Sequence, residues 1–352
     1  MVRPNIRSLY AYEAKELPCR AKLDANESPY PLTDWSSQKL LNRVKRVMTN
    51  RYPDPEAKEL KKVVGSYFGV SSGNLLQGNG SDELISSLIT TFGGPVLYPV
   101  PTFSMYGIIS QALGEKGIAV PLDKSFDIDL ERVLKIIRSQ NPKLIFLSSP
   151  NNPTGNCFSS GKILRIIEKS KGIVVVDEAY QPFSSQRGFL PFLNDYQNLV
   201  IMRTLSKIGL AALRLGFLLA HTEIIREVNK VRLPFNVNSF SQALAVAAMK
   251  DKKGVRSSIE TIIRERDLLQ KEMEKIRDVT SFPSEANFIL FRVKHPDSVY
   301  SLLLKKGVLV RNLHSGIKGC LRVTVGTPEE NTLFLKTLKS AFTEGPLRRR
   351  EV

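Results

Sequence analysis

The sequence predicts an α/β fold in which a large domain with a mostly parallel sheet covered by helices is joined to a small α+β domain. Between residues 74 and 220, short runs rich in Val, Ile and Leu alternate with helical stretches, which is typical of parallel strands buried on both faces. After residue 240 the pattern changes to one long amphipathic helix, three strands and a closing helix. The 352 residues are enough for two such units.

The first 35 residues contain four prolines and little periodicity, so they predict an extended arm. A basic helix is expected around residues 36–50, and a second over 57–68, after Pro53 and Pro55, which disfavour helix before them. The expected strands of the large domain are PVLYPV (95–100), GIAVPL (117–122), KLIFLS (143–148), GIVVVD (172–177), NLVIMR (198–203) and RLGFLLA (214–220).

The C-terminal part is expected to form the small domain. Apolar residues at helical spacing among charges predict an amphipathic helix over residues 256–277. The remaining expected elements are strands at 287–293, 307–313 and 320–326 and a helix at 329–342. The predicted organisation is an N-terminal arm (1–35), a large domain (36–245) and a small C-terminal domain (246–352).

Composition excludes several classes of protein. Apolar residues make up 42% and charged residues 24% of the chain, which excludes wholesale disorder and fibrous repeats. The sequence has no apolar run of about 18 residues, so no membrane-spanning helix is expected, and no secretory signal is seen. Cys19, Cys157 and Cys320 lie too far apart for a disulfide framework, so a cytoplasmic protein is expected.

The net charge of +17 raises the question of a nucleic-acid partner. The charge is spread along the sequence, and its dense cluster is Arg348-Arg349-Arg350. We therefore expect a basic surface that attracts anionic small molecules, and a nucleic-acid-binding protein stays the alternative from another class. The three histidines are scattered without a metal-binding spacing, so no metal is expected.

Polar segments that follow the apolar runs carry the candidate chemistry. Thr204-Leu205-Ser206-Lys207, with Arg214 further on, follows the run at 198–203. A lysine can form an imine with an aldehyde cofactor, and hydroxyls with a guanidinium can hold a phosphate. A lysine in a surface loop is the alternative.

Asp177-Glu178-Ala179-Tyr180 ends the run at 172–177. A buried carboxylate there needs a partner, such as a protonated ring nitrogen; a helix cap or structural ion pair is the alternative. The turn at 149–155 is rich in Pro and Asn and can present an amide to a cofactor oxygen. Gly78-Asn79-Gly80 opens a helix, whose free N–H groups suit a phosphate, although an ordinary capped helix would look similar.

These segments together resemble a known family. Asn152, Asp177 and Lys207 follow one another by 25 and 30 residues, each just past an apolar run. SPNNPTG, VVDEAY and TLSKIGLAALRLGF resemble the three signatures of the fold-type I, pyridoxal-phosphate-dependent aminotransferases of class I/II. Within that class, the sequence is similar to the histidinol-phosphate aminotransferases in LDANESP (23–29), RYPDP (51–55), GNGSDELI (78–85), PTFSMY (101–106), RLPFNVNSFSQ (232–242) and CLRVTVGTPEEN (320–331).

The resemblance implies roles around pyridoxal 5'-phosphate. Lys207 would hold the cofactor and move the substrate proton, and Asp177 would keep the pyridine nitrogen protonated. Asn152 and Tyr180 match the residues that hydrogen-bond the phenolic oxygen, and Phe103 matches the aromatic residue stacked on the ring. The implied phosphate-binding groups are the backbone of Ser81 and Asp82, the hydroxyls of Thr204 and Ser206, and Arg214.

Further roles concern the substrate and a second subunit. Tyr52 matches a residue that reaches the phosphate from the partner subunit, which implies a homodimer with shared sites. Arg322 matches the arginine that binds the substrate carboxylate, and its fork can equally bind a phosphate ester. Arg311 matches a second anion-binding arginine and Tyr12 a tyrosine of the arm that caps the site, while Glu27 is a candidate substrate contact.

The implied activity is amino transfer between L-histidinol phosphate and 2-oxoglutarate, in histidine biosynthesis. A broad or aromatic amino-acid aminotransferase and a threonine-phosphate decarboxylase share the cofactor residues and stay open as alternatives. RLPFNVNS and LDANESP favour the histidinol-phosphate group. The sequence departs from some members between Lys207 and Arg214, where they have one residue more, and at Ala212, where many have Gly.

Overall fold

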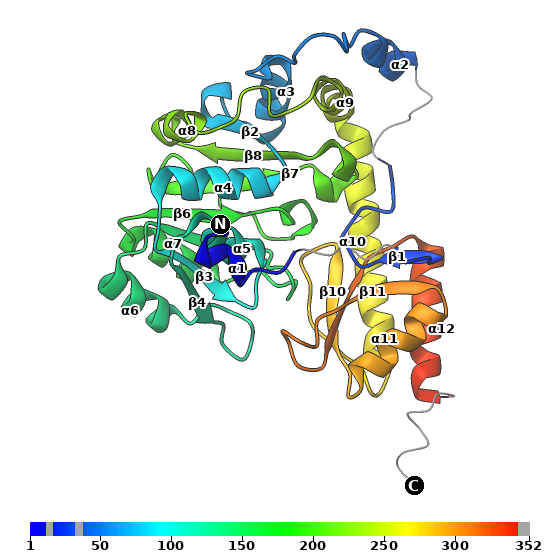
Figure 1. Ribbon diagram of the computed structural model, residues 1–352. Helices are drawn as coiled ribbons and strands as arrows, with labels where there is room; N and C mark the ends of the chain where they lie inside the picture. The colour runs from blue at the N-terminus through cyan, green and yellow to red at the C-terminus, as the bar shows by residue number, and fades with distance from the viewer. Residues whose placement is uncertain (12–16, 32–37, 344–352) are drawn as a thin grey trace.

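The computed structural model describes residues 1–11, 17–31 and 38–343, which form two sheets with their own covering helices (Figure 1). The larger sheet has seven strands in the order β2-β8-β7-β6-β5-β3-β4, and the smaller has five in the order β1-β11-β12-β10-β9. The predicted fold class is confirmed: the large sheet is mostly parallel, and the small unit mixes strands with helices.

The strands of the large sheet are β2 (Leu75–Asn79), β3 (Val96–Val100), β4 (Gly117–Pro121), β5 (Leu144–Ser148), β6 (Ile173–Asp177), β7 (Leu199–Thr204) and β8 (Leu215–Ala220). All but β2 lie where the apolar runs predicted strands. β8 runs antiparallel to both of its neighbours, β2 and β7, whereas the other neighbouring strands are parallel. The sequence of β2, LLQGN, contains a glutamine and a glycine, so it has no continuous apolar run.

Helices cover both faces of the large sheet, which explains why its strands are nearly all apolar. Packed on one face are α3 (Lys58–Phe68), α6 (Leu130–Gln140), α7 (Ser160–Lys169), α9 (Ser239–Lys250) and the first half of α10 (Lys252–Glu274). Packed on the other are α4 (Ser81–Phe92), α5 (Met105–Leu113) and α8 (Thr222–Asn229). β5, one of the interior strands of the sheet, is buried at every position.

The small sheet contains β9 (Thr280–Ser281), β10 (Phe288–Arg292), β11 (Val308–Asn312), β12 (Cys320–Thr324) and β1 (Ala21–Leu23). It packs against α11 (Pro296–Lys305), α12 (Pro328–Thr343) and the second half of α10. β1 comes from the predicted N-terminal arm and pairs in parallel with β11. The arm therefore contributes an edge strand to a sheet built mainly from the C-terminal part of the chain.

Other elements refine the expected boundaries. The helix expected at 36–50 is α2 (Gln38–Lys45), and a short helix, α1 (Pro4–Arg7), lies in the arm. The expected boundary at 245 falls inside α9, which contacts α2 and α3. The short 3₁₀ turns are η1 (Ser72–Asn74), η2 (Gln181–Phe183), η3 (Leu190–Phe192), η4 (Ser206–Ile208) and η5 (Ala211–Leu213).

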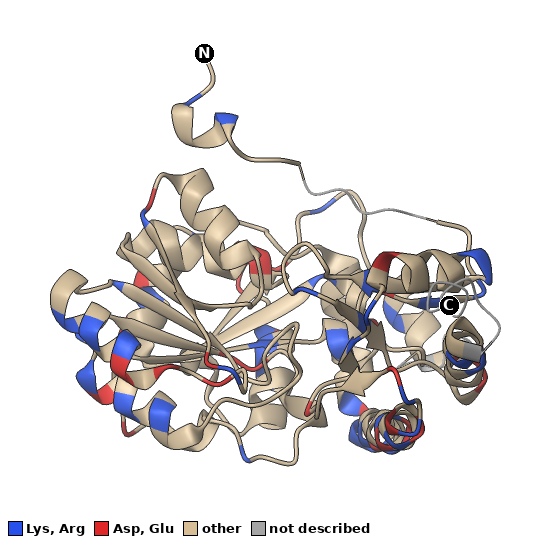
Figure 2. Ribbon diagram, turned by 90° about the horizontal axis from the view of Figure 1, so that it is seen from below, with Lys and Arg blue, Asp and Glu red and all other residues tan. Residues whose placement is uncertain are grey.

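The charged side chains are distributed over both units. Figure 2 shows Lys and Arg on the helices of both, with Asp and Glu among them, which agrees with the spread of charge along the sequence. Among the helices of the described residues, none has the length and apolar character needed to cross a membrane.

Candidate functional site

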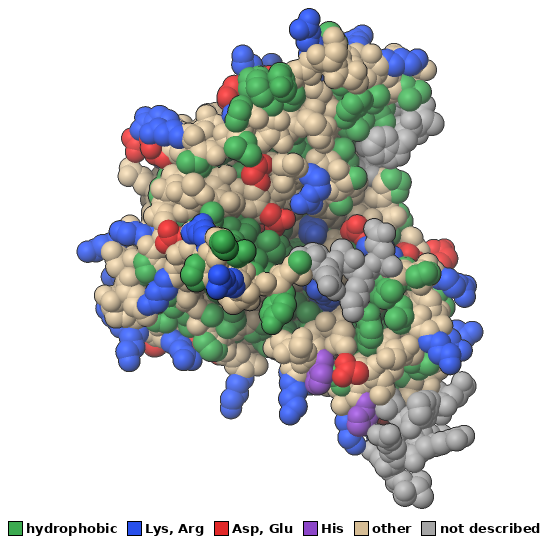
Figure 3. All heavy atoms as spheres, viewed as in Figure 1, with side chains coloured by type: hydrophobic (Ala, Val, Ile, Leu, Met, Phe, Trp, Pro, Cys, Tyr) green, Lys and Arg blue, Asp and Glu red, His purple; other side chains and the backbone are tan. Residues whose placement is uncertain are grey.

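A cavity of about 510 Å³ lies between the large and the small sheet, within the range of about 300–1,000 Å³ that is usual for small-molecule sites. Figure 3 shows the hollow between the two units, with acidic and basic side chains in it. The predicted site residues that line the cavity are Ser81, Asp82, Phe103, Asn152, Asp177, Tyr180, Thr204, Ser206, Lys207, Arg214, Arg311 and Arg322.

Strand order explains why the three central residues meet. β5, β6 and β7 are parallel neighbours, so their carboxyl ends lie at one edge of the sheet. Asn152 follows β5, Asp177 ends β6 and Lys207 follows β7 in η4. Three residues from distant parts of the sequence thereby line one wall.

Asp177 is a buried carboxyl group, 4% exposed. Its Oδ2 accepts a hydrogen bond from the Tyr106 hydroxyl at 2.6 Å and its Oδ1 one from the Ala179 N–H at 3.0 Å. Burial raises the pKa of Asp177 to about 6, although these two bonds and the charge of Lys207 act in the opposite direction. Asp177 forms no ion pair with a described residue, so its negative charge is available to a cationic ligand group.

Tyr106 is a site residue that the sequence did not single out. It lies on α5, is fully buried, and stacks on Phe146 with 4.8 Å between the ring centroids. Burial and the negative charge of Asp177 raise the pKa of Tyr106 well above its usual value, so its hydroxyl keeps the proton that it donates to the carboxylate. PTFSMY placed this tyrosine three residues after Phe103, but nothing in the sequence indicated the direction of its hydroxyl.

Asn26 is a second residue that the sequence did not single out. Its Nδ2 donates to the Tyr180 hydroxyl at 2.9 Å, and its N–H donates to Thr324 Oγ1 at 3.0 Å. Asn26 is buried and has a φ of 55°, a backbone conformation that asparagine tolerates better than most residues. It therefore ties Tyr180 of the large unit to β12 of the small one.

Glu27, the residue next to Asn26, is the substrate contact that the sequence suggested. It pairs with Lys22 at 2.6 Å and does not line the cavity. Lys207 lies on the same wall as Tyr180, with 5.7 Å between its Nζ and the centroid of the tyrosine ring. The amine, the phenol and the buried carboxyl group of Asp177 therefore line the same cavity.

The start of α4 forms a cradle that suits an anion. The first N–H groups of a helix have no partner within the helix and carry partial positive charge. Gly80, directly before α4, has a φ of 83°, and a Cβ on it would come within 2.7 Å of Arg214 Nη2. A Cβ on Gly216 would come within 2.9 Å of the backbone N of Ser81. Glycine at both positions lets the guanidinium and β8 approach the helix start.

The Thr204 hydroxyl closes the turn beside this cradle. Thr204 Oγ1 donates to the carbonyl of Leu215 at 2.9 Å and accepts from the Ser206 N–H at 3.1 Å. The two hydroxyls of Thr204 and Ser206 lie 3.0 Å apart. The Thr204 hydroxyl is thus engaged within the turn, and Ser206 is the better placed of the two to bind an anion.

Two arginines form the opposite wall, on the small sheet. Arg322 Nη1 donates to Asn152 Oδ1 at 2.5 Å and its Nη2 donates to the Asp24 carbonyl at 2.7 Å. Arg311 lies directly opposite Arg322 in the register of β11 and β12. Two guanidinium groups on neighbouring strands make this wall a second anion site.

Like Glu27, the predicted residue Tyr52 does not line the cavity. Tyr52 is 81% exposed and stacks on Phe235, with 4.6 Å between the ring centroids. Tyr12 lies outside the described residues. Among the residues that the structure describes, no group of three or more His, Cys, Asp and Glu side chains is placed to hold a metal ion.

Comparisons with known proteins agree with this geometry. The family model for aminotransferase class I and II matches residues 20–338. The chain is 46% identical over 350 residues to the histidinol-phosphate aminotransferase of Aquifex aeolicus, covering 97% of this chain and 98% of that protein. It is 39% identical over 346 residues to the histidinol-phosphate aminotransferase of Caldanaerobacter subterraneus subsp. tengcongensis, covering 96% and 98%.

A solved structure has a similar fold. It is that of histidinol-phosphate aminotransferase from Sinorhizobium meliloti in complex with pyridoxal-5'-phosphate, with a TM-score of 0.84 over 96% of each chain. Its sequence identity to this chain is 23%, so this likeness concerns the fold alone.

Proposed function

Because this chain belongs to the class I and II aminotransferases, which are pyridoxal-phosphate enzymes, we propose that it transfers the amino group between L-histidinol phosphate and 2-oxoglutarate. The other pair of reactants is imidazole acetol phosphate and glutamate, and the direction that forms histidinol phosphate serves histidine biosynthesis. One observation carries the choice of substrate: 46% identity over 97% of the chain to a protein of that activity.

The cavity residues fit the cofactor. A lysine amine, a buried carboxyl group without a cationic partner in the described chain, and an anion cradle at a helix start line the same cavity. The contact that a Cβ on Gly80 would make with Arg214 indicates how tightly this cradle is built. These features suit an aldehyde, a ring nitrogen and a phosphate, respectively.

When bound, the cofactor supplies a ring that withdraws electrons from the substrate α-carbon. Asp177 holds a proton on the ring nitrogen, because its buried carboxylate is stabilised by the positive charge that it faces. The Nζ of Lys207 would hold the cofactor through its aldehyde, and the same amine would move the proton at the substrate α-carbon. Tyr180 and Asn152 would hydrogen-bond the phenolic oxygen, and Phe103 would cover the ring.

The anions at the two ends are held by separate walls. The first turn of α4, Ser206 and Arg214 would hold the cofactor phosphate, while Arg322 and Arg311 would hold the phosphate ester of histidinol phosphate or a carboxylate of glutamate. The bonds from Arg322 to Asn152 and to the Asp24 carbonyl keep its fork fixed before a substrate arrives. Such preorganisation lowers the cost of ordering on binding.

We also propose that the enzyme is a cytoplasmic homodimer with shared sites. The support is a set of exposed apolar side chains around α2, α3 and the α8–α9 connection: Leu41, Met48, Tyr52, Leu233, Phe235 and Phe240. Exposed apolar side chains of this kind are typical of an interface, and Tyr52 is 81% exposed among them. Sedimentation of the purified protein tests the dimer; a monomer at micromolar concentration would contradict it.

Steady-state rates test the substrate. With 2-oxoglutarate as acceptor, we expect kcat/KM for L-histidinol phosphate to exceed that for L-phenylalanine by about 10²-fold or more, because a buried anion site left empty costs transition-state binding. A higher kcat/KM for phenylalanine would indicate a broad or aromatic aminotransferase. Release of carbon dioxide from threonine phosphate would indicate the decarboxylase.

A further inference from the structure

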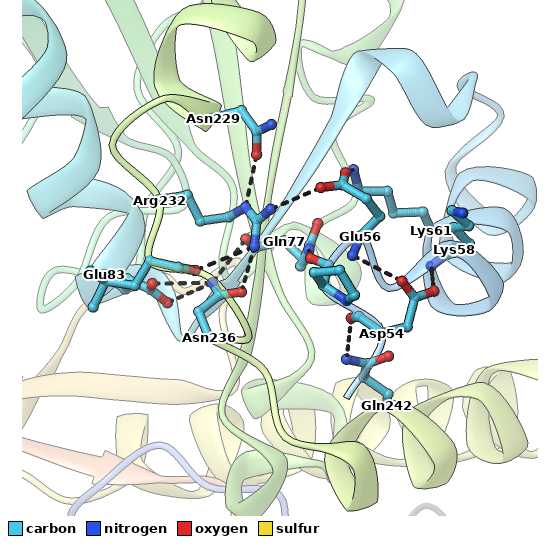
Figure 4. Close-up of polar contacts among 12 residues, drawn as sticks. Asp54, Glu56, Lys58, Lys61, Gln77, Glu83, Asn229, Arg232, Asn236 and Gln242 are labelled. Atoms are coloured by element: carbon cyan, nitrogen blue, oxygen red, sulfur yellow. Dashed lines mark hydrogen bonds and ion pairs between the residues drawn. The ribbon is translucent and has the colours of Figure 1, made fainter. Parts of the chain in front are cut away.

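The loop Arg232–Asn236, between α8 and α9, joins two parts of the chain (Figure 4). One is the start of α4, and the other is the segment from Tyr52 to Glu56. None of the loop residues lines the cavity, although the stretch RLPFNVNSFSQ carries part of the family resemblance. We propose that Arg232 and Asn236 are positioning residues that set the phosphate affinity of the α4 start. This inference rests on the proposed function, in which that start binds the cofactor phosphate.

Arg232 is the centre of the contacts, and its side chain is only 6% exposed. Its Nε donates to Asn229 Oδ1 at 2.8 Å, its Nη1 to Asn236 Oδ1 at 3.0 Å, and its Nη2 to Glu56 Oε1 at 3.1 Å. Each guanidinium nitrogen therefore has a partner, and Glu56 balances the charge. Because the Arg232 guanidinium is bound to all three partners, it holds the loop in place.

Asn236 passes this constraint to α4. An arginine can only donate, so the Asn236 amide turns its oxygen toward Arg232 and its Nδ2 the other way. Nδ2 then lies 3.1 Å from each carboxylate oxygen of Glu83. Glu83 is the third residue of α4, and its Oε2 accepts a hydrogen bond from the Asn79 N–H. The carboxylate is thus bound from two sides.

Restraint of Glu83 matters because of its charge. The N–H groups of the first turn of α4 attract anions, and a carboxylate released beside them would compete for those groups and repel a phosphate. Bound back to Asn79, as in a capping box, Glu83 leaves the groups of Ser81 and Asp82 to the ligand. Asn236 achieves this with a neutral donor, and Arg232 orients that donor.

Backbone conformation supports the same role independently. Phe235, between the two positioning residues, has a φ of 59°, which is uncommon for a bulky side chain. Such conformations persist where the surroundings over-determine them, and they cluster at functional sites. Here the Phe235 ring stacks on Tyr52, so the loop supports both the start of α4 and the residue proposed to reach the second subunit.

The test compares two ligands that differ only in the phosphate. The cofactor is removed from full-length protein, and dissociation constants for pyridoxal 5'-phosphate and for pyridoxal are measured by absorbance and fluorescence titration. For Arg232→Met and for Asn236→Ala we expect the constant for pyridoxal 5'-phosphate to rise about tenfold. The constant for pyridoxal should change less than about twofold, because Lys207 and Asp177 are untouched.

Arg226→Met is the matched control. It removes the same charge from α8, but the Arg226 side chain is 69% exposed and pairs with its neighbour Glu227. Neither dissociation constant should change. A second variant tests the role of the charge: adding Glu83→Gln to Asn236→Ala should bring the constant for pyridoxal 5'-phosphate back to within about threefold of the original, since the released group is then neutral.

The outcomes separate this inference from the proposed function. If both ligands weaken equally, or if neither weakens, Arg232 and Asn236 do not act through the phosphate and the inference is wrong. Failure of Glu83→Gln to restore affinity would also contradict it. If the unaltered protein binds neither ligand, the proposed function itself fails. Should Arg232→Met not fold, the smaller change Asn236→Ala decides the question.

Discussion

Two consecutive carboxylates at the end of β6 face opposite sides of the large sheet and meet different surroundings. Asp177 faces the cavity and is bound by the neutral Tyr106 hydroxyl and a backbone N–H. Glu178 is buried on the other face, where Arg203 donates to its Oε2 from Nε at 2.9 Å and from Nη2 at 2.5 Å. Among the described residues, the second carboxylate forms an ion pair and the first does not.

The partners of each buried carboxylate indicate its role. The Arg203 guanidinium also lies over the ring of Phe68, 5.2 Å from its centroid, and Glu178 Oε1 accepts from the Phe189 N–H at 2.5 Å. Glu178 is therefore satisfied by the fold itself and stabilises it. Burial of the unpaired Asp177 carboxylate destabilises the fold, and a bound cation would offset that destabilisation.

The largest effect should come from the cavity face. Replacing Lys207 by Ala removes both the nucleophile and the proton carrier, so turnover should fall by about 10⁴-fold or more, with the melting temperature of the cofactor-free protein little changed. Lys230→Ala is the control, because Lys230 is exposed and pairs with Glu227. Turnover above a trace in Lys207→Ala would show that another amine does the chemistry.

On the face of the sheet that carries Glu178, a substitution should change the stability of the fold. Glu178→Gln leaves the Arg203 guanidinium buried without its anion, so the free energy of unfolding should fall by about 3–5 kcal/mol. Urea denaturation measures this loss. Adding Arg203→Met should recover much of it, since the isolated charge is then gone. A loss below about 1 kcal/mol in the single variant would remove the contrast between the two carboxylates.

Asp177→Asn should raise the free energy of unfolding of the cofactor-free protein, whereas Glu178→Gln should lower it. The pKa of Asp177 is raised from 3.8 to about 6, so between these pH values the folded carboxyl group keeps a proton that the unfolded one has released. Stability therefore falls as the pH rises through this window and stays low above pH 6. The Asn variant avoids the loss and should be more stable than the original by up to about 3 kcal/mol above pH 6.

Chemical denaturation at pH 4 and pH 7 checks this sign. The two proteins should be equally stable near pH 4, because both then carry a neutral side chain at position 177. With pyridoxal 5'-phosphate bound, the order at pH 7 should reverse, since the carboxylate then faces a cation. An Asn variant that is less stable without cofactor at pH 7 would mean that the fold already compensates this charge.

The smallest effect is expected at an exposed carboxylate. Hydrogen bonds from Arg43 and Lys250 lower the pKa of Glu59 to about 2, so its contribution is present above its ordinary pKa and is lost as the pH falls toward 2. The Glu59 side chain is 57% exposed, and solvent screens such pairs. Glu59→Gln should cost less than about 1 kcal/mol at pH 7, and less still in high salt.

Much of the central site could be predicted from the sequence. Asn152, Asp177 and Lys207 each follow an apolar run, and parallel strands bring such positions to one edge. The predicted family is confirmed by the match over residues 20–338. These successes share a cause: each depends on a pattern within a short stretch and on a general rule for sheets.

The residues that the sequence missed depend on distant contacts. Tyr106 meets a carboxylate 71 residues away, and Asn26 meets a tyrosine 154 residues away. LDANESP carries part of the family resemblance, but its pattern does not indicate which of its polar side chains faces the cavity. β1 has three residues and a partner near the other end of the chain, so no local window contains the information that makes it a strand.

The pairing of β1 with β11 also has a consequence during protein synthesis. At about 5–20 residues per second, β11 leaves the ribosome roughly 15–60 s after β1. During that interval Asp24 and Asn26 lack their partners Arg322 and Thr324. Lys207 is therefore synthesised before the wall that faces it, and the cavity can be complete only when β11 and β12 have been translated.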